Sequence, residues 1–100
     1  MVQSEEVQIS RHAQHRGAQS NLRADDLDLV RRYGVLERRT GVRFYFVRKR
    51  DVERFGSVEP RLRRLHGIVM VLSNDNTVIT VYRNRQALRD IRRKSKYHLA

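Results

Sequence analysis

The sequence of 100 residues contains no cysteine, no tryptophan and a single proline, and acidic side chains are half as frequent as basic ones. The absence of cysteine excludes disulfide bonds and thiol catalysis and removes the usual sulfur ligands of structural zinc. The longest apolar run, Ile68–Leu72, is far shorter than the roughly 20 residues that cross a bilayer. The first residues contain no apolar block like that of a secretory signal. We therefore expect one small cytoplasmic domain that is stabilised by packing and does not contact a membrane.

Arginine dominates the charge of the chain. Lysine and arginine together number 22 against 11 acidic residues, which leaves a net charge of +11, and 19 of the 22 are arginine. A guanidinium group binds phosphate through two donors and stacks on bases, whereas lysine acts as a point charge. The composition therefore predicts a nucleic-acid partner. The alternative is a compositional bias that spreads arginine over the protein without giving it a ligand.

The amino-terminal third reads as a short lead followed by two helices. Residues 1–9 are polar and weakly patterned, which suits a flexible lead or a short edge strand. Ser10 is a typical cap for a helix that runs to about Gln19. A second helix is predicted over Ala24–Tyr33, because acidic residues occupy its start, apolar residues recur at helical spacing and Gly34 follows its end.

After Gly34, apolar residues alternate with polar ones at every second position, as in a β-strand. Val35–Arg39 and Val42–Lys49 predict a hairpin. Residues 50–65 are charged and lack a sustained pattern, so we expect a loop with one helical turn near Arg61–Leu65.

A second hairpin is predicted in the last third of the chain. Ile68–Leu72 is apolar throughout, as a central strand covered on both faces would be, and a turn of Asn and Asp leads into the strand Thr77–Arg83. Asn84 then precedes a basic helix with a narrow apolar stripe of Ala87, Leu88 and Ile91.

This order predicts an α+β fold: two amino-terminal helices, an antiparallel sheet of about four strands, and a carboxy-terminal basic helix, with the helices packed on one face. We expect this fold to form a single domain over residues 10–97. We expect Phe44 and Phe46 to pack against the helix face that carries Leu27 and Val30. The predicted buried strand residues are Ile68, Val69, Val71, Ile79 and Val81.

Several stretches of the chain resemble a widespread family of small bacterial proteins that is catalogued as a domain of unknown function. The resemblance covers roughly residues 8–97 and is strongest at the end of the chain. The stretches that carry it are the His12 and Arg16 pair, Asp26–Gly34, Thr40–Phe46, Val78–Arg85, Ile91–Lys94 and Lys96-Tyr97.

That family is similar to the barnase, EndoU, colicin and RelE group of nuclease folds, which includes the BrnT and RelE ribonuclease toxins. The resemblance implies a RelE-like fold and RNA cleavage that needs neither a metal nor another cofactor. It also implies a toxin controlled by a separate antitoxin protein. Many family members carry Arg-Gly-Ile about eight residues after the histidine, whereas this chain has Ser20-Asn21-Leu22.

Metal-independent RNA cleavage requires a base, an acid and cations near the phosphate. A histidine ring has an unperturbed pKa of about 6.5 and suits both proton transfers, so we assign this role to His12. Arg16, one helical turn later, and Arg83 would then bind the phosphate. Thr80 and Tyr82 would position it or share in the proton transfer. The alternative is structural: His12 and Arg16 form an ordinary solvated helix face, and Thr80 and Tyr82 are strand residues.

The terminal basic segment is the predicted nucleic-acid-binding surface. Between Arg83 and Lys96 there are seven cations and one acid, Asp90. Tyr82 and Tyr97 at its two ends would stack on bases, which favours single-stranded RNA. Besides Arg83, the cations of this surface are Arg85, Arg89, Arg92, Arg93, Lys94 and Lys96.

Two further functions remain open at this stage. The same surface would serve a non-catalytic module that binds RNA, the ribosome or DNA, and the missing family arginine favours this alternative. A third function is a pairing module whose exposed strand edge binds another chain. A metal site is not predicted, because His12 and His15 lack a nearby carboxylate to complete one.

Overall fold

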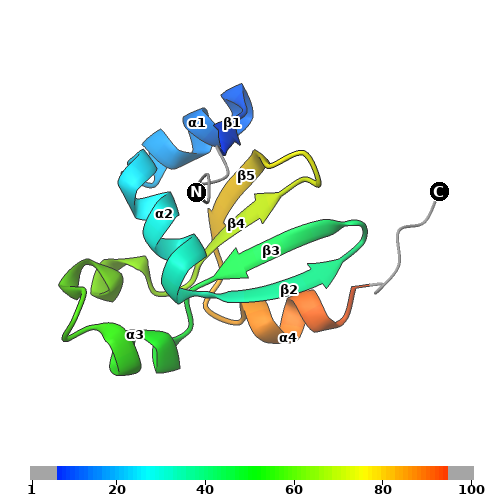
Figure 1. Ribbon diagram of the computed structural model, residues 1–100. Coiled ribbons are helices and arrows are strands. Elements are labelled where there is room, and N and C mark those ends of the chain that lie inside the picture. Colours follow the sequence, from blue (N-terminus) through cyan, green and yellow to red (C-terminus); the bar gives the residue numbers. More distant parts are fainter. Residues whose placement is uncertain (1–6, 95–100) are drawn as a thin grey trace, which may run out of the picture.

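The computed structural model describes residues 7–94 (Figure 1). Within this range the chain forms an α+β fold with a five-stranded mixed sheet. None of the helices in this range is long and apolar enough to span a bilayer. Residues 1–6 of the predicted lead, together with Lys96 and Tyr97, lie outside the described residues. In chain order the elements are β1 (Gln8–Ile9), α1 (Arg11–Gln19), α2 (Ala24–Tyr33), β2 (Val35–Arg39), β3 (Val42–Phe46), α3 (Lys49–Phe55), the 3-10 helix η1 (Pro60–Leu65), β4 (Ile68–Leu72), β5 (Thr77–Arg83) and α4 (Ala87–Arg92).

The strands lie in the order β1-β5-β4-β3-β2. The four predicted strands are present, although the one predicted over Val42–Lys49 ends at Phe46 because Lys49 begins a helix, and each pairs antiparallel with the next along the chain. The fifth strand is β1, which matches the short edge strand that was one of the two expectations for residues 1–9. Its parallel pairing with β5, where Gln8 lies opposite Thr77, was not predicted. A wholly antiparallel sheet of four strands is therefore wrong, because a strand of two residues leaves too little alternation to recognise.

Both amino-terminal helices begin where the sequence predicted. The Ser10 side chain accepts a hydrogen bond from the backbone N–H of Ala13 at 3.1 Å, which caps α1. At the start of α2, the buried Asp26 carboxylate accepts a hydrogen bond from the backbone N–H of Arg23 at 2.9 Å. Its other oxygen accepts one from the Arg64 guanidinium. Asp26 therefore fixes the first turn of α2 and links this helix to η1.

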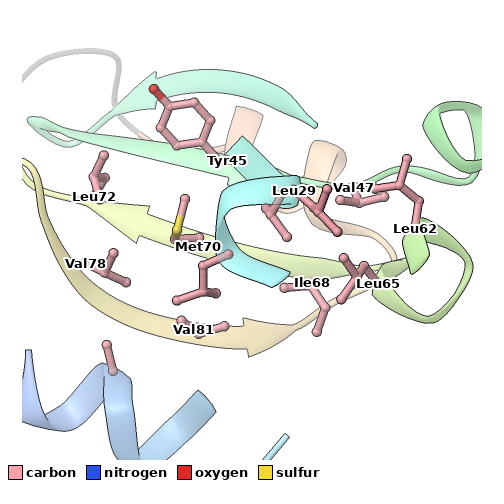
Figure 2. Packing of buried hydrophobic residues seen from close by; sticks show 13 residues of the cluster. Leu29, Tyr45, Val47, Leu62, Leu65, Ile68, Met70, Leu72, Val78 and Val81 are labelled. Atoms are coloured by element: carbon pink, nitrogen blue, oxygen red, sulfur yellow. The ribbon is translucent and has the colours of Figure 1, made fainter. Parts of the chain in front are cut away.

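One face of the sheet packs against α1, α2 and η1. Ala13 of α1 and Leu29 of α2 pack here on residues of the three central strands (Figure 2). Tyr45 and Met70 contribute from the sheet, and Leu62 from η1 closes the layer. Burial of this large apolar surface is the main stabilising contribution to the fold.

The opposite face packs against α4. Phe44 and Phe46 lie on this face with Val69, and Ala87 and Ile91 of α4 cover them. The predicted stripe of α4 is thus confirmed. The predicted contact of the two phenylalanines with α2 is wrong, as is the placement of all helices on one face, because Tyr45 rather than its neighbours points toward α2.

A bulge in β5 overturns one predicted core residue. Val71 lies opposite Thr80 but Leu72 lies opposite Val78, so Ile79 is an extra residue in the pairing. Val78 and Val81 consequently share a buried face, whereas Ile79 is 39% exposed. The other four predicted core residues of β4 and β5 are buried.

The segment predicted as a loop contains a short helix. The strand β3 ends at Phe46 and α3 begins at Lys49. The Asp51 carboxylate accepts hydrogen bonds from the backbone N–H and the guanidinium of Arg48, which fixes the start of α3. The prediction of a loop over residues 50–65 is wrong here because only Val52 and Phe55 contact the core, too few for a recognisable apolar stripe. The helical turn predicted near Arg61–Leu65 is confirmed as η1.

Candidate functional site

The predicted meeting of His12 and Thr80 is present in the structure. Nε2 of His12 lies 3.1 Å from Oγ1 of Thr80, although 68 residues separate them in the chain. The helix α1 lies beside β5, as Figure 1 shows, and packs against it. Ser10 fixes this arrangement because its hydroxyl donates to the backbone carbonyl of Ile79 at 3.1 Å. The His12 ring is exposed, so it is accessible to a ligand while one of its nitrogens is held by the strand.

Tyr82 lies two residues beyond Thr80 and packs against the core on the α4 side of the sheet. Its burial, followed by the negative charge of Asp90, raises the pKa of the Tyr82 phenol above its ordinary value. Tyr82 therefore remains protonated at neutral pH. It is able to donate a hydrogen bond or a proton, but it does not act as a base.

The two predicted phosphate-binding arginines of this site lie in different surroundings. Arg16 is exposed on α1, one turn after His12, and its guanidinium has no hydrogen-bond or ion-pair partner among residues 7–94. Arg83 instead donates to the backbone carbonyl of His66 at 2.9 Å and to that of Arg64 at 3.1 Å. The structure thus brings Arg83 to the end of η1 rather than to His12.

The predicted basic surface divides into two parts. On α4, the Arg92 guanidinium donates to the Glu37 carboxylate of β2 at 3.2 Å. The Lys94 ammonium lies 5.8 Å from the centre of the Phe44 ring. Arg93 is exposed near them. Arg85 and Arg89 instead line a hollow at the end of the sheet.

This hollow, which we call the basic hollow, has a volume of about 360 Å³ and lies between the start of α3 and the turn from β5 into α4. Sequence reasoning identified only Arg85 and Arg89 of its five cations. The other three were missed because they fall at a strand end and in a predicted loop. The run of three consecutive cations was the available signal. The lining cations are Arg48, Lys49, Arg50, Arg85 and Arg89.

Two of the five cations are already paired. The Arg48 guanidinium forms two contacts with the buried Asp51 carboxylate, and the hydrogen bond to Asp51 raises the pKa of Arg48. Nε of Arg89 lies 3.3 Å from Oδ1 of Asp90. The remaining three cations have no ion-pair partner within the described part of the chain; they are Lys49, Arg50 and Arg85.

Among residues 7–94, no three histidine, aspartate or glutamate side chains lie together as metal ligands would. His15 contacts Gln19, with Nε2 of the ring 3.2 Å from Nε2 of the amide.

Comparisons of the chain with known protein families, with curated proteins and with solved structures gave no match. The resemblance to the RelE-like nucleases therefore stays a prediction, and the functional argument rests on the residues described above.

Proposed function

We propose that this protein binds single-stranded RNA, mainly through the phosphates of the RNA backbone. The observation that carries the proposal is a group of three cations that have no ion-pair partner among residues 7–94 and line one hollow of a chain with a net charge of +11. These cations are Lys49, Arg50 and Arg85. Cations that lack counter-charges repel one another, and a polyanion relieves that repulsion while releasing its own counterions. Arg16 adds an exposed cation on α1, the helix that packs against β5.

The test is a measurement of RNA affinity against salt concentration. A fluorescently labelled single-stranded RNA is titrated with the protein from about 50 to 200 mM salt and followed by anisotropy. With three phosphate contacts, the logarithm of the association constant is expected to fall with a slope of about −2 against the logarithm of salt concentration. Single-stranded and double-stranded DNA of the same sequence serve as comparisons. Absence of RNA binding at the lowest salt concentration, or equal binding of duplex DNA, would reject the proposal.

A second candidate function is metal-independent endoribonuclease activity, and the 3.1 Å contact of His12 with Thr80 favours it. Thr80 orients the exposed ring, which is then available to remove a proton from a ribose 2′-hydroxyl and to return one to the leaving oxygen. Tyr82 remains protonated nearby as a donor to the phosphate. On this proposal the fold is RelE-like and a separate antitoxin protein controls the enzyme.

This candidate is tested by incubating the protein with a mixed RNA pool in EDTA and mapping the ends. Attack by the 2′-hydroxyl is expected to leave 2′,3′-cyclic phosphate ends without any added metal. If the RNA remains intact while it binds, the protein belongs to the non-catalytic class of RNA-binding modules. Purification of this protein from cells that also express the neighbouring genes would test whether an antitoxin exists. The antitoxin is expected to co-purify with the protein and to inhibit cleavage.

A further inference from the structure

The basic hollow is formed by two chain segments that leave the sheet at the same end. The strands β3 and β5 flank β4 and are antiparallel to it, and Phe46 and Tyr82 both lie opposite Val69. The residues that follow each strand therefore emerge side by side. Gly67, just before β4, joins them: its N–H donates to the carbonyl of Val47 at 2.8 Å, and its carbonyl accepts from the N–H of Asn84 at 2.7 Å.

Arg85 is held at the hollow by its backbone. Gly67 has a φ of +84°, and a Cβ at this position would lie 2.7 Å from Cγ of Arg85. Asn84 fixes the turn, because its side-chain oxygen accepts from the N–H of Gln86 at 2.9 Å and its amide donates to Asp90 at 2.8 Å. The close contact with Gly67 and the fixed turn restrict where the Arg85 side chain starts, so less conformational entropy is lost when it binds an anion.

The charge at this end of the molecule is unbalanced. None of the residues that line the hollow is acidic. Arg48 and Arg89 have carboxylate partners, whereas Lys49, Arg50 and Arg85 have none among residues 7–94. The positive charge also acts on the neighbouring His66. Burial lowers the pKa of His66, and the positive charges of Arg85, Arg83 and Lys49 lower it further.

We propose that the basic hollow binds the terminal phosphate of an RNA strand. The inference rests on the proposed RNA binding and specifies which part of the RNA this hollow takes. A terminal phosphate monoester carries about −1.5 to −2 charges at neutral pH and has three oxygens available. An internal phosphodiester carries one negative charge, and the RNA backbone continues from it in both directions. A concave site with three unpaired cations therefore favours the strand end, whereas the exposed cations of α4 suit the continuous backbone.

The experiment compares three otherwise identical single-stranded RNAs with a 5′-phosphate, a 3′-phosphate or hydroxyls at both ends. All carry 2′-O-methyl groups, so that they bind but are not cleaved. We expect one of the phosphorylated RNAs to bind the intact protein about tenfold more tightly than the RNA without a terminal phosphate, as a charge-assisted contact predicts. Which end gains identifies the orientation of the strand. Equal affinity for all three RNAs would overturn the inference while leaving the proposed RNA binding intact.

The variant Lys49→Glu/Arg85→Glu tests whether the preference originates at the hollow. Glutamate retains the Cβ and Cγ of Arg85, which pack on Gly67. The matched control is Arg38→Glu/Arg63→Glu, which changes the net charge equally at two exposed side chains without partners among residues 7–94. We expect the first variant to lose the preference and the control to keep it. Loss in both variants would overturn the assignment to the hollow.

Inorganic phosphate provides a readout that is independent of RNA. It is expected to raise the melting temperature of the parent and of the control more than that of the hollow variant, since a ligand of the folded state stabilises it. Equal stabilisation of all three proteins would overturn the phosphate site. If phosphate raises the melting temperatures of the parent and the control more than that of the hollow variant but no RNA binds, both the RNA assignment of this site and the proposed function are wrong.

Discussion

The edge of β5 and the end of the sheet supply different chemistry. At the edge, His12 and Thr80 offer an imidazole ring and a hydroxyl 3.1 Å apart, with Arg16 one turn later on the same helix. At the end, the basic hollow is lined by five cations, and none of its lining residues in the described range 7–94 is a histidine or an acid. On the proposed functions, proton transfer and binding of a terminal phosphate would lie at separate places, so that a substitution at one place would leave the other unchanged.

The two places lie along one strand. Asn84 lies four residue steps along the chain from Thr80, which corresponds to about 13 Å at about 3.3 Å per residue of extended strand. A strand end held in the basic hollow would therefore place an internal phosphate, rather than the terminal one, near His12.

The largest effect is expected from His12→Gln. Glutamine retains polarity but not the titrating group, so the cleavage rate is expected to fall by about a hundredfold or more, while RNA affinity changes less than about twofold. Single-turnover cleavage and anisotropy measure the two quantities. His15→Gln is the matched control on the same helix, because His15 contacts only Gln19 among the described residues. A cleavage rate in His12→Gln equal to that of the parent removes this residue from the mechanism.

The variant Arg92→Glu/Arg93→Glu is expected to have a smaller effect than His12→Gln, and this effect is a loss of RNA affinity. These α4 cations contact internal phosphates on the proposed arrangement, so affinity falls about equally for RNA with and without a terminal phosphate. The salt slope becomes shallower by about 0.7 for each contact that is lost. Anisotropy over the same salt range measures both. If the double variant instead abolishes the preference for a terminal phosphate, the division between α4 and the basic hollow is wrong.

Gly67→Ala tests the backbone that positions Arg85. A Cβ here meets both an unfavourable φ and Cγ of Arg85, so we expect a loss of about 1–3 kcal/mol in the free energy of unfolding and a partial loss of the preference for a terminal phosphate. Urea unfolding and anisotropy are the measurements. Gly17→Ala on α1 is the comparison, because its added Cβ would have ordinary contacts of 3.7 Å or more. Equal effects of the two substitutions would contradict the account of Gly67.

The smallest effect concerns the pH dependence of stability. The folded-state pKa of His66 lies below its ordinary value, so below a pH of about 6.5 the unfolded chain binds a proton that the folded chain does not. The free energy of unfolding is therefore expected to fall as the pH decreases through about 6.5 toward the folded-state pKa. His66→Gln should flatten this part of the profile, as measured by urea unfolding at several pH values. An unchanged slope would mean that burial and the nearby cations do not lower the pKa of His66 in the folded protein.

The parts of the fold that the sequence predicted well have local signals. The cap at Ser10, the acidic start of α2 and the turn before Thr77 each act within a few residues, and these elements begin as expected. The bulge at Ile79 has no such signal, because it depends on how β5 fits β4. The side of the sheet on which α4 packs is likewise decided by tertiary contacts rather than by the helix itself.

The two parts of the candidate site differ in the same way. The family resemblance directed attention to His12 and Thr80, and their contact is present. The basic hollow joins residues 48–50 to residues 85–89, and that neighbourhood exists only because β3 and β5 flank β4. A run of three cations at a strand end indicates charge, but it does not indicate which other cations will lie beside it.

The most direct test of the separation between chemistry and phosphate binding measures cleavage and binding together in His12→Gln and Lys49→Glu/Arg85→Glu. Single-turnover cleavage of 5′-phosphorylated and 3′-phosphorylated RNA is followed at saturating protein, and affinity is measured on the uncleavable RNAs. The account predicts that His12→Gln abolishes cleavage but retains the preference for a terminal phosphate, while the hollow variant loses that preference but cleaves once RNA is saturated. Loss of both properties in either variant, with the fold intact, would contradict it.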